Sequence, residues 1–347
     1  MRLTAARVLR EDGSLRPGTV TVEGDRIAGV GDPDPGEDLP DRTLAPGLID
    51  LQVNGFGAID VWAGGPADLD RLGRDLAARG TTAWCPTLTS RALPAYSAWW
   101  DEHPDPLPGE IGLHLEGPFL SRAGAHPPHV LVPPDRAWLA ALPPRVRIVT
   151  LAPELPGALE AISLLSADRL VALGHSHATF EEARAAADHG ATAVTHVFNA
   201  MAPLGHRQPG LAGAALTDRR LTPMVIGDGV HVHPAVLGLV CTHKPAVLVS
   251  DSVAWEGAGL STTDGAARRD DGTLAGSIIT LADAVRVAVQ RAGIPLPMAL
   301  AAASTHPAGL LGDPDRGVLR PGARADLIAL DPGLAVVGVW VAGEART

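Results

Sequence analysis

Apolar and polar positions change their pattern twice along the chain. Residues 2–9 and 19–30 contain alternating or clustered β-forming residues, and turn segments rich in Asp, Gly and Pro separate and follow them. Residues 325–330 and 335–342 repeat this pattern near the other end of the chain. The pattern predicts that both chain termini contribute strands to one small β-sandwich domain.

The central part of the chain carries eight short apolar runs, at residues 48–51, 82–85, 111–115, 146–151, 170–173, 193–197, 223–226 and 246–249. Segments with helical periodicity follow most of them, as at 68–79 and 277–291. Thr179, with Glu182 three residues later, predicts a capping box at the start of another helix. Eight strand–helix units over roughly 250 residues predict a (β/α)₈ TIM-like barrel of the α/β class.

These two patterns set the expected domain organisation. Residues 1–46 and 319–347 are predicted to form the small β-domain, and residues 47–318 are predicted to form the barrel. A chain of 347 residues is long enough for one large domain and one small one.

Composition narrows the class of protein. The net charge of −11, from 28 basic and 39 acidic side chains, argues against nucleic acid or an anionic membrane as a partner. Two cysteines are too few for a disulfide framework and fit a reducing cytosol. The N-terminal residues lack the apolar core of a signal peptide, and no apolar run approaches membrane-spanning length. We therefore expect a cytoplasmic α/β protein, with an enzyme as the favoured class.

Polar residues gather where the expected barrel strands end. Barrel enzymes collect their reactive groups at the carboxyl ends of the strands. The polar residues at those places are Gln52, Asn54, His114, Glu116, His175, His177, His196, Asn199, Asp228, His231 and Asp251. A random scatter of 13 histidines would not fall there so often.

Glu116, His175 and His196 form a candidate metal site. They end the third, fifth and sixth expected strands and would therefore converge at one mouth of the barrel. One carboxylate and two imidazoles suit Zn²⁺ or Fe²⁺, and three protein ligands leave a position for water. Any one of these residues alone is more often a core residue or a helix cap, but three of them at the ends of strands favour the metal site.

Four further residues are candidates for catalysis or binding. Asp251 ends a buried strand opposite the candidate ligands, where a carboxylate acts as a general base or, alternatively, as a helix N-cap. His126 lies on a Gly/Pro-rich loop and could polarise a substrate carbonyl, although a surface-loop histidine is the simpler interpretation. Arg207 and His231 could bind an anionic group.

The motifs around these residues resemble a known family. The chain resembles the N-acetylglucosamine-6-phosphate deacetylases of the amidohydrolase superfamily. The motifs that carry the resemblance are APGLIDLQVNG at 45–55, HLEGPF at 114–119, GAHPP at 124–128, GHSHAT at 174–179, THVFNAM at 195–201, GDGVHV at 227–232, LVSDS at 248–252, LAGS at 274–277 and PGARADLIALD at 321–331. They cover essentially the whole chain in the family's order, and HLEGPF together with THxxNAM is highly specific.

The resemblance implies hydrolysis of the N-acetyl group of N-acetylglucosamine 6-phosphate to glucosamine 6-phosphate and acetate. It implies one divalent metal ion per subunit on Glu116, His175 and His196, with zinc expected and iron or cobalt as alternatives, and it makes Asp251 the catalytic acid/base. It also implies a homodimer in which Arg207 reaches the site of the neighbouring subunit. The expected substrate contacts are Ala125, His126, Asn199, Ala200, Arg207, Asp228, His231, Leu274, Ala275, Gly276 and Ser277.

Some alternatives stay open at this point. Gln52 and Asn54 stand where most superfamily members have a His-x-His pair, which resembles the single-metal branch and leaves a second ion undecided. N-acetylgalactosamine 6-phosphate differs at one hydroxyl and is an alternative substrate. A cyclic amide or another acylated amino sugar would use the same chemistry, and a non-catalytic sugar-phosphate sensor is an alternative from another class.

Overall fold

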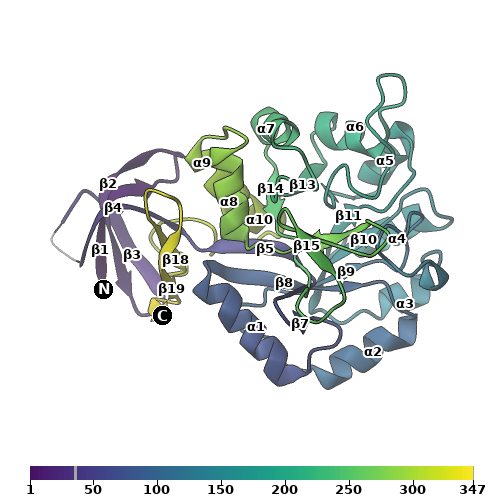
Figure 1. The fold of residues 1–347 in the computed structure, drawn as a ribbon, viewed down its shortest axis with the longest axis horizontal. Coiled ribbons are helices and arrows are strands. Elements are labelled where there is room, and N and C mark those ends of the chain that lie inside the picture. The colour runs from purple at the N-terminus through teal and green to yellow at the C-terminus, as the bar shows by residue number, and fades with distance from the viewer. Residues whose placement is uncertain (35–36, 347) are drawn as a thin grey trace.

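Strands from both ends of the chain share one sheet at the side of a larger α/β body (Figure 1). The structure is a computed structural model, and it describes residues 1–34 and 37–346. The strands of this sheet are β1 (Arg2–Leu9), β2 (Leu15–Glu23), β3 (Arg26–Gly31), β4 (Glu37–Pro46), β18 (Leu327–Leu330), β19 (Val336–Val341) and β20 (Glu344–Arg346).

Strand β4 joins the two ends of the chain. It pairs in parallel with β1 and antiparallel with β18, so the sheet order is β20-β19-β18-β4-β1-β2-β3. Leu3, Val20, Leu44 and Trp340 share one buried apolar cluster that includes residues from both termini. The predicted small domain built from both chain ends is confirmed. Its division from the barrel at residues 46 and 318 stays a prediction, and residues 35, 36 and 347 of that domain lie outside the described residues.

Eight parallel strands form the barrel, and all eight predicted apolar runs are confirmed as strands. They are β5 (Leu48–Val53), β8 (Thr81–Thr89), β9 (Leu113–Glu116), β10 (Val146–Leu151), β11 (Leu170–Leu173), β12 (Ala193–Val194), β13 (Thr222–Ile226) and β14 (Val247–Val249). Each pairs with the next one along the chain. Val53 bridges in parallel to Ser252, and the Asp251 amide donates to the Gln52 carbonyl over 3.0 Å, so the last strand returns to the first.

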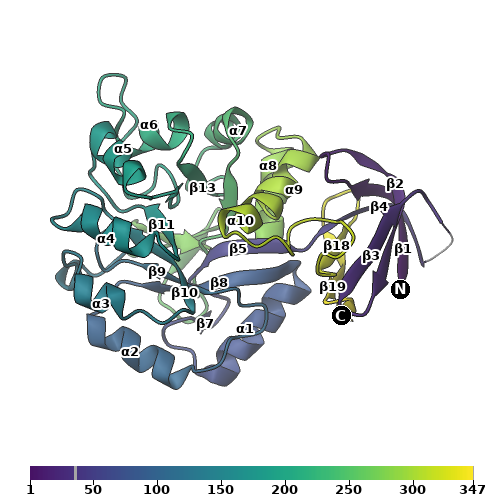
Figure 2. The ribbon, with the colours of Figure 1, turned by 180° about the vertical axis from the view of Figure 1, so that it is seen from behind.

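The barrel interior is apolar along the bodies of its strands. Ile49, Ile148, Met224 and Val247 belong to one fully buried cluster. Ala308, on the short helix α10 (Thr305–Leu310), packs against the same cluster. Figure 1 shows β15 in front of the barrel, and Figure 2, which gives the view from behind, shows α10 in front of it. We therefore place the barrel's mouth on the β15 side, opposite to α10.

Helices cover the outside of the barrel (Figures 1 and 2). They are α1 (Pro66–Ala78), α2 (Leu93–Glu102), α3 (Arg136–Ala140), α4 (Ala158–Leu165), α5 (Phe180–Asp188), α6 (Gly210–Thr217), α7 (Pro234–His243), α8 (Leu281–Gln290) and α9 (Leu296–Ala302). The predicted capping box of α5 is confirmed, because the Thr179 side chain accepts from the Glu182 amide and the Glu182 carboxylate accepts from the Thr179 amide. Among the described helices, none combines the length and apolar composition that a membrane crossing requires.

The prediction of a helix from residue 277 was wrong at its start. Helix α8 begins only at Leu281, where Thr280 and Asp283 form a second capping box. The four residues 274–277 instead form a strand, because they pair with the neighbouring chain segment. This three-stranded sheet consists of β15 (Ser261–Thr263), β16 (Ala266–Arg268) and β17 (Leu274–Ser277), and we call it the mouth hairpin.

The remaining short elements are a two-stranded ribbon of β6 (Gly55–Phe56) and β7 (Ile59–Asp60) after the first barrel strand, and a 3₁₀ turn at Pro128–Val130 after the third. Both follow strands at the same end of the barrel as the mouth hairpin.

Candidate active site

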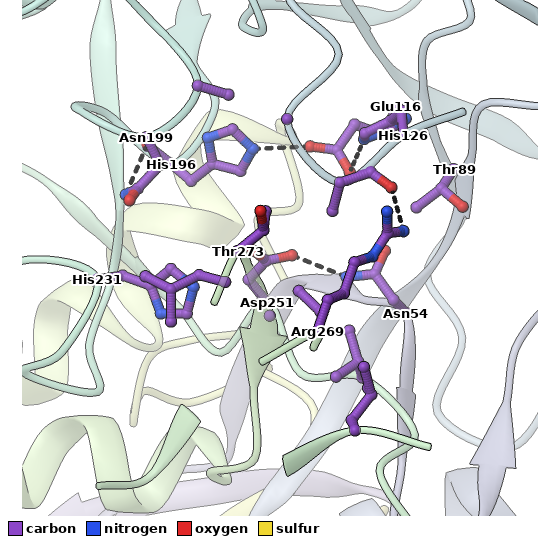
Figure 3. Close-up of a pocket in the computed structure, with 18 of the residues that line it drawn as sticks. Asn54, Thr89, Glu116, His126, His196, Asn199, His231, Asp251, Arg269 and Thr273 are labelled. Atoms are coloured by element: carbon purple, nitrogen blue, oxygen red, sulfur yellow. Dashed lines mark hydrogen bonds and ion pairs between the residues drawn. The ribbon is translucent and has the colours of Figure 1, made fainter. Parts of the chain in front are cut away.

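A cavity of about 790 Å³ opens at the carboxyl ends of the barrel strands (Figure 3). Most of the residues predicted for the site line it: Asn54, Glu116, Ala125, His126, His175, His196, Asn199, Ala200, His231, Asp251, Leu274, Ala275 and Gly276. The lining comes from strands far apart in the sequence, as the barrel prediction requires.

Three residues predicted as substrate contacts lie elsewhere. Arg207 is exposed and does not line the cavity of its own chain. Asp228 is buried beside His231 and does not line the cavity. The Ser277 hydroxyl is buried and donates to the Ser250 carbonyl over 2.6 Å, so it supports the strand end.

The candidate ligands Glu116, His175 and His196 converge. Glu116 Oε1 lies 2.8 Å from His196 Nε2 and 3.3 Å from His175 Nε2, and the two Nε2 atoms are 3.1 Å apart. In a tetrahedral site with metal–ligand bonds near 2.0–2.1 Å, neighbouring ligand atoms lie about 3.3 Å apart. The residues therefore fit a single four-coordinate divalent ion, with one position left for water or substrate.

Burial and neighbouring charges set suitable protonation states for two of the three ligands, whereas at His196 burial is outweighed by the adjacent Glu116 carboxylate, which raises the pKa of the imidazole. Burial lowers the pKa of His175 to about 4, so at neutral pH its ring is uncharged and keeps a lone pair for a metal. Burial would raise the pKa of Glu116, but the imidazoles of His126, His175 and His196 outweigh it and hold that pKa well below its usual range. A charged carboxylate beside a neutral imidazole is the state that metal binding needs.

Two carboxamides lie where a second metal would need imidazoles. The Gln52 Nε2 group donates to Glu116 Oε1 over 2.9 Å, and the Asn54 Nδ2 group donates to Asp251 Oδ1 over 2.7 Å. Each carboxamide thus holds a carboxylate of the site. Within the described chain, Gln52 Oε1 and Asn54 Oδ1 are buried without a hydrogen-bond partner. Carboxamide oxygens are weaker ligands for first-row metals than imidazoles are, so these two residues suit a second ion poorly.

Asp251 lies two residues after the end of β14 and faces the ligand set (Figure 3). Burial, and then the charge of Glu116, raises its pKa to about 7, although His196, His231 and Asn54 act in the opposite direction. A carboxyl group with a pKa near neutrality can both accept and return a proton during one reaction cycle.

His126 presents an N–H group to the same site. The Ser90 backbone amide donates to its Nδ1 over 3.1 Å, so in the neutral ring the proton is on Nε2. That Nε2 lies 3.5 Å from Glu116 Oε2, and the imidazole is buried. His126 is therefore placed as a hydrogen-bond donor beside the candidate metal ligands.

Asp228 orients His231. Its Oδ2 accepts from His231 Nδ1 over 2.6 Å, and its Oδ1 accepts from the amides of Val230 and His231. Burial would raise the pKa of Asp228, but the hydrogen bond from His231 and the amide donors lower it. The carboxylate thus fixes the ring of a histidine that does line the cavity.

Several site residues hold a left-handed backbone. His175, His196 and Asp251 have φ values of 49°, 28° and 49°, and Phe198 and Ala200 have φ values of 78° and 49°. Residues other than glycine seldom adopt this conformation, and it concentrates at functional sites. Here it turns the chain sharply where each strand ends, at the residues that carry the polar side chains.

The cavity also contains residues that the sequence reasoning missed, which are Arg91, Arg122, Arg269, Thr89 and Thr273. Arg269, on the mouth hairpin, donates from Nη2 to the Ala125 carbonyl over 2.6 Å and so ties the hairpin to the loop of His126 (Figure 3). In the sequence, only its position shortly before the LAGS segment could have indicated that Arg269 belongs to the site, and no hydrophobic periodicity marks it.

Comparisons with known proteins agree with this geometry. The amidohydrolase family model matches residues 43–346. The chain is 36% identical to an N-acetylgalactosamine-6-phosphate deacetylase of Escherichia coli O157:H7, over 99% of this chain and 98% of that one. It is also 36% identical to the human N-acetylglucosamine-6-phosphate deacetylase, over 99% of this chain and 93% of the relative.

A solved structure is similar over the whole length. It is a variant of N-acetyl-D-glucosamine-6-phosphate deacetylase from Mycobacterium smegmatis in complex with N-acetyl-D-glucosamine-6-phosphate. It is 35% identical to this chain, covers 100% of it and 99% of its own length, and superposes with a TM-score of 0.93. These findings confirm the fold class and the resemblance predicted from the motifs.

Proposed function

The chain belongs to the amidohydrolase family, and from this we propose that it removes the N-acetyl group of N-acetylglucosamine 6-phosphate to give glucosamine 6-phosphate and acetate. The observation that carries the proposal is the convergence of Glu116, His175 and His196 beside Asp251, in a chain that matches deacetylases over nearly its full length. The reaction is the hydrolysis of a linear amide.

We propose that Glu116, His175 and His196 hold one divalent metal ion per chain. Their nitrogen and oxygen donors, spaced 2.8–3.3 Å apart, support this. We expect zinc, with iron and cobalt as the alternatives that the same donors accept. A bound ion would supply Lewis-acid polarisation of the amide carbonyl and a lowered pKa for a water molecule.

Asp251 moves the proton in this mechanism. Its carboxylate accepts a proton from the attacking water and then donates it to the departing amine nitrogen. A pKa raised to about 7 supports both steps, because the group can exist in either state near neutral pH. Asn54 holds Oδ1 of the same carboxylate and thereby fixes its orientation.

His126 stabilises the charge that develops on the carbonyl oxygen. Its proton is on Nε2, because the Ser90 amide donates to Nδ1. A buried N–H donor aimed at a developing oxyanion is worth about 10²–10³-fold in kcat. The buried ring beside Glu116 supports this role.

The remaining cavity residues bind the sugar phosphate. The proposed contacts are Ala125, Asn199, Ala200, His231 and the segment 274–276. Asp228 contributes by fixing His231, and Ser277 by supporting the end of β17.

Arg207 contributes to phosphate binding from a second copy of the chain, which makes the protein a homodimer. Its exposed position, outside the cavity of its own chain, supports a contact made in the neighbouring subunit.

We place the protein in the cytoplasm, which the two free, buried cysteines, Cys85 and Cys241, support.

N-acetylgalactosamine 6-phosphate is the second candidate substrate. It is favoured by one observation, the 36% identity to the Escherichia coli O157:H7 relative named for that sugar. A non-catalytic sugar-phosphate sensor is disfavoured, because the complete set of ligands and Asp251 is present.

The proposal is tested by acetate release from the metal-reconstituted protein with four sugars. These are the 6-phosphates of N-acetylglucosamine and N-acetylgalactosamine and the two unphosphorylated sugars. We expect the highest kcat/KM for N-acetylglucosamine 6-phosphate and little turnover without the phosphate. No turnover of any of the four by protein that holds one metal ion per chain would overturn the proposed substrate class.

A further inference from the structure

We propose that Glu154 is a positioning residue that holds His175 in the orientation for metal binding. Glu154 follows β10, the strand between those that carry Glu116 and His175. It does not line the catalytic cavity. Together with Glu160 and Glu182 it lines a separate groove on the outside of the barrel. Any effect it has on the site must therefore pass through other residues.

The carboxylate of Glu154 binds the segment that directly follows His175. Its Oε2 accepts from the Ser176 hydroxyl over 2.7 Å, and its Oε1 accepts from the His177 amide over 2.6 Å. The Ser176 hydroxyl in turn accepts from the Ala178 amide over 2.9 Å. One side chain thus fixes the backbone of the three residues after the metal ligand.

The same carboxylate binds the loop after β9. Its Oε1 also accepts from the Ser121 hydroxyl. The amides of Ser121 and Arg122 donate to the His175 carbonyl over 3.1 and 2.9 Å. Glu154 therefore connects the loop after β9, which bonds to the His175 carbonyl, with the segment 176–178 that directly follows His175.

These loops fix the ring of His175 as well as its backbone. His175 Nδ1 donates to the Arg122 carbonyl over 2.9 Å, which leaves the Nε2 lone pair free toward Glu116 and His196. The backbone of His175 is held at φ 49°, a conformation that persists only where the surroundings determine it. The hydrogen bonds that Glu154 accepts from the Ser121 and Ser176 hydroxyls and the His177 amide help to hold this backbone conformation.

Hydrogen-bond partners outside the ligand set usually contribute 10–100-fold to metal affinity. Glu154 differs from the common case because it does not touch the imidazole. It holds the backbone on both sides of the contact between the imidazole and the Arg122 carbonyl.

Zinc affinity of the metal-free full chain tests the inference. We would measure Kd by chelator competition for the unmodified protein, Glu154→Ala and Glu154→Gln. We expect Glu154→Ala to weaken zinc binding about 10–100-fold. Glu154→Gln should lose less, because a carboxamide keeps one acceptor oxygen for the His177 amide.

Glu160→Ala is the matched control, because Glu160 is exposed and lines the same groove. It should bind zinc as the unmodified protein does. Melting of each metal-free variant separates positioning from general support. A lower melting temperature in Glu154→Ala with unchanged zinc affinity would overturn the inference.

If Glu154→Ala does not fold, Glu154→Gln decides, and zinc affinity equal to that of the unmodified protein would then overturn the inference. The inference rests on the metal site that the proposed function requires, but the measurement uses no substrate. An unreactive sugar phosphate therefore counts against the proposed substrate, and unchanged zinc affinity counts against Glu154.

Discussion

The bodies and the carboxyl ends of the barrel strands differ in almost every physical respect. Along the bodies, side chains such as Ile148, Met224 and Val247 fill the interior and are fully buried. At the ends, buried imidazoles and carboxylates face one another across a cavity. Within one or two residues, each strand passes from packing that stabilises the fold to groups whose burial costs free energy.

Strand β5 contains both kinds of position. Ile49 and Leu51 point into the apolar interior, while Gln52 and the following Asn54 hold the carboxylates of the site. The comparison indicates that the fold tolerates the unfavourable groups at its mouth because the strand bodies supply its stability. Substitutions at the two places should therefore change different quantities.

The largest effect is expected for Asp251→Asn at the mouth. A carboxamide cannot accept and return a proton, so kcat should fall by about 10³–10⁴-fold, while metal content and melting temperature stay close to those of the unmodified protein. Acetate release, metal analysis and thermal melting measure the three quantities. Asp264→Asn, on the exposed turn of the mouth hairpin, is the control for the loss of one charge. Residual activity within tenfold of the unmodified protein would remove Asp251 from the mechanism.

The reverse result is expected for Met224→Ala in the barrel interior. Its side chain is fully buried, so truncation should cost about 2–5 kcal/mol of unfolding free energy while kcat at low temperature stays nearly constant. Denaturant unfolding provides the free energy. Met298→Ala, at a half-exposed position of α9, should change it by less than about 1 kcal/mol. A large loss of kcat with an unchanged free energy of unfolding would contradict the division of the barrel into an interior that sets stability and a mouth that sets activity.

Asp50 makes stability depend on pH from within the barrel. Burial raises its folded-state pKa from 3.8 to about 7. The folded protein therefore binds a proton at Asp50 more tightly than the unfolded chain does. The contribution of this proton to the free energy of unfolding is full below about pH 4 and is lost as pH rises to about 7.

The carboxamide of Asp50→Asn stays neutral at every pH, so the variant should not lose stability as pH rises. At pH 8 its free energy of unfolding should exceed that of the unmodified metal-free protein by about 2–4 kcal/mol. Below pH 4 the difference should vanish. Unfolding free energies at both pH values measure it, with the exposed Asp101→Asn as control. A difference independent of pH would mean that Asp50 keeps an ordinary pKa.

The smallest effect is expected for Arg207→Ala, outside the cavity. We expect KM for the phosphorylated sugar to rise about tenfold, or about 1.4 kcal/mol, with little change for the unphosphorylated sugar. Arg219→Ala, another exposed arginine, is the control. Equal changes for both sugars would show that Arg207 is structural.

The sequence predicted the strand bodies better than the details of their ends. Eight apolar runs and the box of Thr179 and Glu182 follow local rules of periodicity and capping, and the structure confirms them. The helix predicted from residue 277 began too early, since pairing with β16 overrides the helical preference of that segment.

Contacts between distant segments had no local signal. The bond from Arg269 to Ala125 spans 144 residues, and nothing in the pattern marks either residue as its partner. The left-handed backbone of His175 and Asp251 was equally hidden, because such turns are usually marked by glycine or asparagine and neither occurs there. Asp228 was predicted as a substrate contact, but it does not line the cavity, and its hydrogen bond to His231 follows only from the three-dimensional arrangement.

The most direct test of the mouth as a catalytic site is the pH dependence of kcat/KM for the metal-loaded protein. Asp251 must be ionised to accept the first proton, so activity should be present above its pKa and should be lost as pH falls through it. The pKa is about 7 in the metal-free chain, and a bound cation would lower it, so the acid limb should lie at or below about pH 7. A profile that stays flat from pH 8 to pH 4 would contradict the assignment of Asp251 as the base.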